Sequence, residues 1–236
     1  PLATLVNFAA HPTIHPPQNN RFTAEFPGVM MRAVEAATGA PCVFLQGAAG
    51  DLQCEIDDSL WGKQDFIEPI GRALADEVMA LWRKIETAAP EQPGIRVAHE
   101  QFDFGTREGF DVTSEEIRKR LRLIYTPPLA NHYLGKYADG RMRPRMHVAL
   151  LNGELALVSG SGEFFSDLSV QLKERAPVKT LFLGYCNGHD LYFPTRRGAE
   201  EGGYGAEPPA AFVEVGAGEA MIERALALLD ELTGAR

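Results

Sequence analysis

Three short apolar runs, each followed at once by a turn of glycine or polar residues, constrain the fold of this chain more than any other feature. The runs are residues 2–10, 41–47 and 179–186. Apolar runs of this length predict strands, and the first fits a strand buried on both faces. The three runs end in His11, in the turn 47–51 and in the turn 187–192. Because active sites of α/β proteins collect at strand ends, these turns are where chemistry is expected.

The segments between these runs are predicted to form helices and one β-hairpin. The spacing of apolar residues predicts helices over 26–39, 65–85, 115–125, 163–175 and 216–232. Thr113 with Glu116 and Asp65 with Glu68 have the spacing of N-terminal helix caps. Asn152-Gly153, between two alternating runs, predicts a tight β-hairpin.

The polar stretch 127–145 fits an irregular surface excursion or lid. No repeat or linker divides the chain. Strands mixed with helices in this way predict a single α/β domain over residues 1–236, with a mixed β-sheet core and flanking helices.

Charge and cysteine content exclude several classes of function. A formal net charge of −9, with one basic cluster at 118–122, argues against a nucleic-acid partner. No apolar stretch reaches the ~20 residues of a transmembrane segment. The three cysteines form no CxxC pair and fit a reducing, cytoplasmic compartment. The chain starts mid-strand, so we expect a longer protein with a segment upstream.

His11 and Glu163 each allow two interpretations. His11 is followed by Pro12, which lacks a backbone N–H and forces a non-helical exit. It fits either a core histidine bonded to a backbone carbonyl or a side chain aimed at a site. Glu163 follows Ser-Gly-Ser-Gly. It fits either an acidic residue in the first turn of a helix, stabilised by the helix dipole, or a carboxylate approached closely by another group.

The other polar residues at strand ends also have plain structural interpretations. Asp51 closes the turn QGAAGD and fits a helix cap, an Asx turn or a residue that supports a site. Asn187 fits a side chain bonded to its own loop, and Tyr192 fits a half-buried phenol. His189 lies between them in the stretch NGHDLY.

Taken together, five stretches resemble one family in their order and rough spacing. They are NFAAHPT (7–13), AEFPG (24–28), FLQGAAGD (44–51), SGSGEFF (159–165) and GYCNGHDLYFPT followed by EEGGYGA (184–206). The family is that of the neutral/alkaline, non-lysosomal ceramidases, and the nearer likeness is to its shorter bacterial members. The resemblance spans nearly the whole chain and implies the C-terminal portion of a larger catalytic domain.

The resemblance implies a catalytic zinc ion held by two histidines, a glutamate and a tyrosine. His11, Glu163 and Tyr192 match the second histidine, the glutamate and the tyrosine of the family motifs. The first histidine has no counterpart here, so a missing N-terminal segment is expected to complete the site. Zn²⁺ accepts histidine and carboxylate ligands. We expect His189 and Asp51 to support the ligands or to transfer protons.

The predicted function is that of a zinc-dependent amidohydrolase acting on a linear acyl amide, such as a ceramide-like lipid. Gly47 stands where classical members of the family carry a serine, so the expected nucleophile is zinc-activated water. Two other functions fit the same residues. One is a non-catalytic relative that binds a ligand or partner, and the other is a metal-dependent hydrolase or lyase of a small polar substrate.

Overall fold

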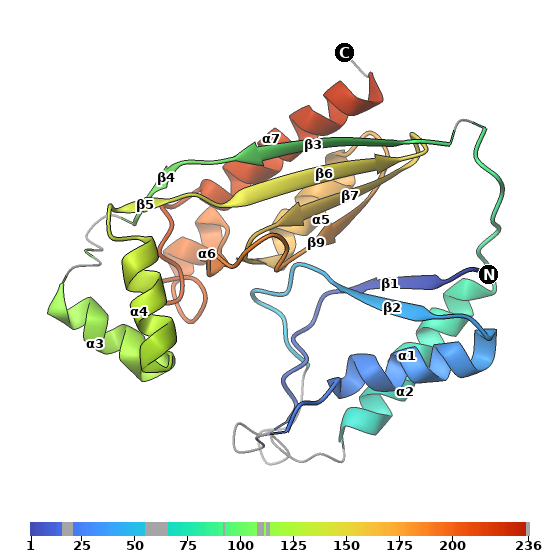
Figure 1. Cartoon of the computed structure of the whole chain (residues 1–236), viewed down its shortest axis with the longest axis horizontal. Coiled ribbons are helices and arrows are strands. Elements are labelled where there is room, and N and C mark those ends of the chain that lie inside the picture. Colours follow the sequence, from blue (N-terminus) through green and yellow to red (C-terminus); the bar gives the residue numbers. More distant parts are fainter. Residues whose placement is uncertain (16–20, 55–65, 92, 108–110, 112–113, 235–236) are drawn as a thin grey trace.

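The fold is built around two sheets that lie beside one another (Figure 1). The computed structural model describes residues 1–15, 21–54, 66–91, 93–107, 111 and 114–234. The larger sheet has the strand order β3-β6-β7-β9 and is antiparallel except for the parallel pair β7–β9, while β1 and β2 form a parallel pair. The strands are β1 Thr4–Phe8, β2 Cys42–Gln46, β3 Ile95–Gln101, β4 Phe104–Gly105, β5 Arg141–Met142, β6 Arg145–Leu151, β7 Leu155–Gly160, β8 Glu163–Phe164, β9 Lys179–Leu183 and β10 Tyr192–Phe193.

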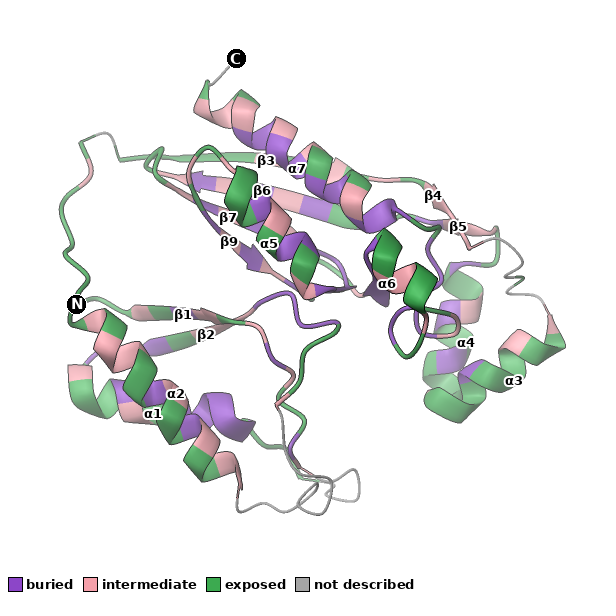
Figure 2. Ribbon diagram, turned by 180° about the vertical axis from the view of Figure 1, so that it is seen from behind, coloured by how far each residue is buried: buried purple, intermediate pink, exposed green. Residues whose placement is uncertain are grey.

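Helices flank both sheets (Figure 2), which confirms the predicted mixed α/β fold. α5 and α7 pack on one face of the larger sheet, where Leu168 and Leu229 join Val148 and Phe182 in the main core. No helix of the described residues is long and apolar enough to cross a membrane. The helices are α1 Glu25–Thr38, α2 Ile67–Trp82, α3 Glu115–Ile124, α4 Pro127–Lys136, α5 Ser166–Arg175, α6 Arg196–Glu201 and α7 Ala217–Thr233.

The first strand is not buried on both faces, contrary to the prediction for residues 2–10. Val6 and Cys42 pack against α1 and α2 in a second core cluster. On the opposite face of the pair, Leu5 is 54% exposed and Val43 is 41% exposed. The prediction is wrong because helices cover only one face of this pair among the described residues, and an apolar sequence cannot indicate how many neighbours a strand will have.

The predicted hairpin is confirmed, and the N-terminal cap of α3 is seen at Ser114. Asn152 and Gly153 have φ of 54° and 75°, as a tight turn between β6 and β7 requires. α3 is capped by Ser114, whose side chain accepts a hydrogen bond from the N–H of Ile117. Thr113, the predicted cap, lies outside the described residues, as does Asp65.

Two further expectations are wrong and bear on the site. The stretch 127–145 is not irregular throughout, because it contains α4, which begins with two prolines whose fixed φ suits a first helical turn. Glu163 does not begin a helix. It lies on the short strand β8, and α5 begins three residues later at Ser166.

A side-chain amide and a backbone bond join the two sheets. The Nδ2 of Asn7 donates to the carbonyl oxygens of Leu45, at 3.1 Å, and of Phe182, at 3.0 Å. The N–H of Gly184 donates to the carbonyl of Gln46 at 3.0 Å. These bonds bring together the turns that follow β1, β2 and β9, where the sequence predicts the functional residues.

Candidate functional site

Glu163 is the point on which four polar side chains converge, although it is only 9% exposed. Its Oε1 lies 3.0 Å from His189 Nε2, and its Oε2 accepts the Tyr185 hydroxyl at 2.9 Å. His11 Nε2 lies 3.5 Å from Oε2. Tyr192 also makes a side-chain hydrogen bond to this carboxylate. Residues separated by more than 150 positions in the sequence therefore meet at one carboxyl group.

Strand pairing places Tyr192 beside Glu163. β8 and β10 pair in parallel with the register Tyr192 to Glu163, so the two side chains are adjacent on the same face. The glycine before Glu163 is needed for this close approach. A Cβ on Gly162 would lie 2.6 Å from the carbonyl oxygen of Leu191. The Ser-Gly-Ser-Gly segment before Glu163 is thus crowded, as predicted, because the backbone of the turn that leads into β10 packs closely against it.

The hydrogen bonds of His11 fix which of its ring nitrogens faces Glu163. The backbone N–H of His11 donates to Leu52 O at 3.2 Å. The Tyr185 hydroxyl donates to Glu163, so it can only accept from His11 Nδ1–H, 3.1 Å away. In a neutral His11 the lone pair of Nε2 then faces the carboxylate, an arrangement that a shared cation would stabilise.

His189 is held at both ring nitrogens. A carboxylate only accepts, so His189 donates from Nε2 to Glu163. The Tyr133 hydroxyl lies 2.7 Å from Nδ1, and Nδ1 of a neutral His189 accepts a hydrogen bond from it. The ring of Tyr185 stacks on the imidazole, with centroids 5.8 Å apart. The orientation of His189 is therefore set by three neighbours.

A second buried carboxylate lies directly after His189. Asp190 is 3% exposed, and its Oδ1 accepts the Tyr137 hydroxyl at 3.0 Å and lies 2.6 Å from Lys136 Nζ. Its Oδ2 accepts the Ser161 hydroxyl at 2.7 Å. The same Lys136 also donates to the backbone carbonyl of His189 at 2.9 Å.

Burial and hydrogen bonding act in opposite directions on the pKa of Glu163. Burial alone raises it, but hydrogen bonds from His189, Tyr192 and Tyr185 and the nearby His11 outweigh burial, so the pKa of Glu163 lies below its usual value. Burial first, and then the negative charge of Glu163, raises the pKa of Tyr133. Burial and the same carboxylate also raise the pKa of Tyr185 and of Tyr192. With no cation bound at Glu163, these phenols therefore remain hydrogen-bond donors at neutral pH.

Four of the five predicted site residues come together, and the fifth lies close by. His11, Glu163, His189 and Tyr192 meet as described. The carboxylate of Asp51 instead accepts from the Ser166 N–H at 2.6 Å and from its hydroxyl at 3.1 Å. It thus binds the N-terminus of α5, three residues after Glu163, where a carboxylate interacts favourably with the helix dipole.

The sequence predictions missed Tyr133 and Tyr185, and gave Asp190 no role. Tyr133 lies in the stretch predicted to be irregular. The spacing of Tyr133 and Tyr137, one turn of a helix apart, was the available signal, since their rings stack at the C-terminal end of α4 with centroids 6.2 Å apart. Tyr185 lies within the motif GYCNGHD, but nothing in the sequence indicates which of its side chains point at Glu163.

The donor atoms match the chemistry of a zinc site, although the described residues do not form a complete one. They contain no group of three or more His, Cys, Asp or Glu side chains arranged to hold a metal ion. Two ligands of a tetrahedral Zn²⁺, each about 2.0–2.2 Å from the metal, lie roughly 3.4 Å apart. His11 Nε2 and Glu163 Oε2, 3.5 Å apart, have this separation. The phenol oxygen of Tyr192, which is hydrogen-bonded to the same carboxylate, is a third donor atom.

Comparison with known proteins identifies the fold. Over 98% of its length the chain matches the crystal structure of neutral ceramidase from Pseudomonas aeruginosa, with a TM-score of 0.68 and 14% sequence identity. The chain has the fold of part of a neutral ceramidase. A ceramidase complexed with C2 matches over the same share, with a TM-score of 0.69 and 13% identity.

The match is to part of those structures, and it is a match of structure alone. The chain covers 44% of the Pseudomonas aeruginosa ceramidase and 46% of the second ceramidase, so it spans less than half of their length. No protein-family model matches the sequence, and no curated protein sequence matches it significantly. The resemblance inferred from the five motifs is confirmed for the fold.

Proposed function

We propose that this protein is a metal-dependent hydrolase of acyl amides and that Glu163 lies at the centre of its active site. The convergence of His11, His189 and Tyr192 on one buried carboxylate carries the proposal. The neutral ceramidase fold supports a lipid-like N-acyl substrate. Residues 1–236 would then be the C-terminal portion of a larger catalytic domain.

His11, Glu163 and Tyr192 are the residues that would hold the metal, and Zn²⁺ suits their nitrogen and oxygen donors. A second histidine would come from a part of the protein outside these residues. When bound, zinc supplies an acidic water molecule and polarises a carbonyl oxygen. Tyr185 holds His11 through Nδ1, which is the support that a ligating histidine requires from a neighbouring hydrogen-bond partner.

The other residues of the site would handle protons and charge. His189 would exchange a proton with a nucleophilic water and with the leaving amine through Nδ1, once one of them replaces the Tyr133 hydroxyl there, while Glu163 holds the ring at Nε2. Tyr133 and Tyr185 each have one hydroxyl proton, now donated to His189 and to Glu163, and either would stabilise an oxyanion on the substrate by exchanging that acceptor for it. Asp51 would support Glu163 by fixing the start of α5.

The test is hydrolysis of N-acyl amides that differ in the length of the acyl chain. We expect the intact protein to release the fatty acid from a long-chain N-acylsphingosine, to lose this activity with a chelator, and to regain it with zinc. His189→Gln should reduce the rate by about 10²–10⁴-fold, the usual contribution of a general acid–base group. Glu223→Gln, at an exposed carboxylate paired with Arg175, is the matched control and should retain full activity.

Two outcomes would contradict the proposal. If the protein hydrolysed a short, polar amide faster than the long-chain amide, its substrate would be a small polar molecule and not a lipid. Tight binding of the long-chain substrate without turnover, with zinc present, would indicate a non-catalytic binding protein.

A further inference from the structure

His189 is held at its backbone as well as at its ring, and both contacts come from one helix. From α4, Tyr133 reaches Nδ1 of the ring and Lys136 Nζ donates to the backbone carbonyl of His189. This helix lies more than 50 residues earlier in the sequence. Its position relative to the turn 185–191 therefore determines where the imidazole points.

Asp190 makes the link between that turn and the rest of the molecule. Lys136 at the end of α4 and Tyr137 directly after it bind one carboxylate oxygen, and the Ser161 hydroxyl binds the other. The Ser161 oxygen in turn accepts the backbone N–H of Arg145 at 2.8 Å. The backbone N–H of Asp190 donates to Ser161 O at 2.7 Å. Both oxygens and the amide of Asp190 are thus bonded to other parts of the fold.

The turn that Asp190 holds has an unfavourable backbone conformation. Three non-glycine residues in it have positive φ: Tyr185 at 59°, Asn187 at 65° and Leu191 at 63°. Asparagine tolerates this region, but a leucine there costs of order 1–3 kcal/mol and persists only where surrounding contacts enforce it. Leu191 is fully buried and directly follows Asp190. The bonds of Asp190 are the contacts in the right place to enforce this conformation.

We propose that Asp190 is a positioning residue, which ties the turn 185–191 to α4 and Ser161 and thereby aims His189 at Glu163. Asp190 itself makes no bond to the Glu163 carboxylate in this arrangement and acts through its neighbours. The effect on catalysis rests on the proposed function, whereas the effect on the position of His189 does not.

The test is the ¹⁵N NMR spectrum of the histidine rings in Asp190→Asn, with the His189 signals assigned by their loss in His189→Gln. Asparagine keeps the size of the side chain but replaces one bonded oxygen by an NH₂ group, which cannot accept, so either the bond from Ser161 or those from Tyr137 and Lys136 are lost. We expect the two ring nitrogens of His189 to change shift as the bonds to Tyr133 and Glu163 loosen. In the hydrolysis assay, kcat should fall by about 10- to 100-fold, as for a catalytic group misplaced by about 1 Å, with a smaller change in KM.

A second variant and a control keep the result interpretable. Tyr137→Phe removes one bond to Asp190 and retains the ring, so it should shift the His189 signals less in a protein that still folds. Asp103→Asn makes the same chemical change at an exposed, arginine-paired carboxylate and should leave these signals unchanged. Unchanged His189 shifts in both Asp190→Asn and Tyr137→Phe would overturn the positioning role. Absence of hydrolysis by the wild-type protein would overturn the proposed function alone, because the spectra do not depend on turnover.

Discussion

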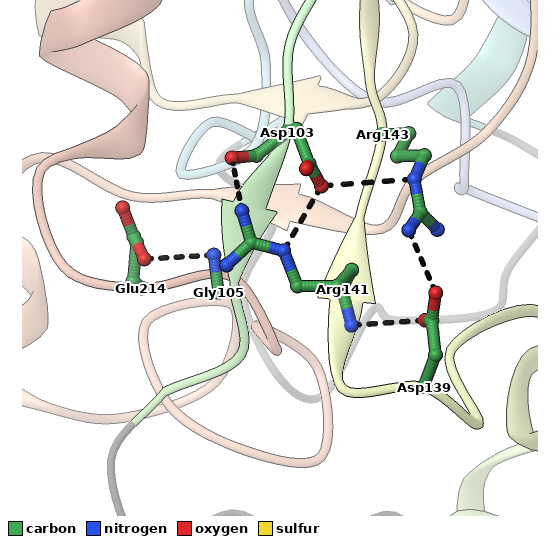
Figure 3. A network of polar contacts seen from close by, with 6 residues as sticks. All are labelled: Asp103, Gly105, Asp139, Arg141, Arg143 and Glu214. Carbon is green, nitrogen blue, oxygen red and sulfur yellow. Dashed lines mark hydrogen bonds and ion pairs between the residues drawn. The ribbon is translucent and has the colours of Figure 1, made fainter.

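Among the carboxylates that pair with cationic side chains, Asp190 lies inside the fold and Asp103 lies on its surface. Asp190 is 3% exposed and binds Lys136, Tyr137 and Ser161. Asp103, shown in Figure 3, has a side chain that is 57% exposed, and it pairs with Arg141 at 3.0 Å and with Arg143 at 3.6 Å.

The surface network around Asp103 holds the strands β4 and β5 together and is not part of the candidate site. Arg141 lies on β5 and also donates to the backbone carbonyl of Asp103 at 2.6 Å, just before β4. Glu214, on the side of β4 away from Arg141, accepts a hydrogen bond from the N–H of Gly105 at 2.7 Å. These bonds hold a two-residue strand pair that carries none of the predicted functional residues (Figure 3).

The comparison shows that burial, not the number of partners, decides what such a network does. Exposed ion pairs contribute little, because water screens them and ordering two long side chains costs entropy. Removing one partner from a buried network leaves polar groups without water or protein to bind, which costs far more. Only the buried network can therefore hold a strained turn in place.

The largest expected effect is that of Asp190→Ala on stability. The substitution leaves the hydroxyls of Tyr137 and Ser161 without their acceptor and the Lys136 ammonium without its counter-ion. We expect the free energy of unfolding to fall by about 3–5 kcal/mol, measured by urea denaturation. A loss below about 1 kcal/mol would place the Asp190 network in the same class as the surface one.

Gly162→Ala should have an intermediate effect. The new methyl group would lie 2.6 Å from the carbonyl oxygen of Leu191 and 2.6 Å from the ring of Phe193. Overpacking of this kind costs about 1–3 kcal/mol, again measured by urea denaturation. Gly135→Ala is the matched control, because no atom lies within 4 Å of its added Cβ and alanine favours the helix α4. Equal losses in the two variants would refute the crowding at Gly162.

The smallest effect is expected at Asp103, and it should depend on pH and salt. The hydrogen bond from Arg141 lowers the pKa of Asp103, so the folded state binds its proton less readily than the unfolded state does. Its contribution is therefore fully present above the unfolded value of about 3.9 and is lost as the pH falls through the lower folded value.

Melting temperatures of wild type and Asp103→Asn would show this. The small difference at pH 7 should shrink as the pH falls below about 4, the unfolded value, and should also shrink in 1 M NaCl, where the Debye length is about 3 Å. A difference that persists at high salt would mean that the surface network contributes through something other than exposed charge.

The sequence predicted the elements whose signals are local. The hairpin at Asn152-Gly153 needs φ > 0 at both residues, which Asn and Gly tolerate. The C-terminal helix is indicated by apolar residues that recur at helical spacing within one continuous stretch of sequence. His11, Glu163 and Tyr192 were selected because they lie in motifs at strand ends, and the fold brings them together.

What the sequence could not predict depends on partners that lie far away along the chain. β8 is a strand only because it pairs with β10, almost 30 residues later, so residues 163–164 looked like the start of a helix. Tyr133 joins the site only because α4 packs beside the turn of His189. The exposure of Leu5 likewise depends on which face of β1 the helices cover.

The most direct test of the whole account is the zinc content of the intact protein and of three variants, measured by elemental mass spectrometry after dialysis. We predict stoichiometric zinc in the wild-type protein and in the surface control Glu223→Ala. His11→Ala and Glu163→Ala should each lose the metal, because each removes one member of the pair whose donor atoms lie 3.5 Å apart. Stoichiometric zinc in both of these variants would show that the metal site is not centred on Glu163.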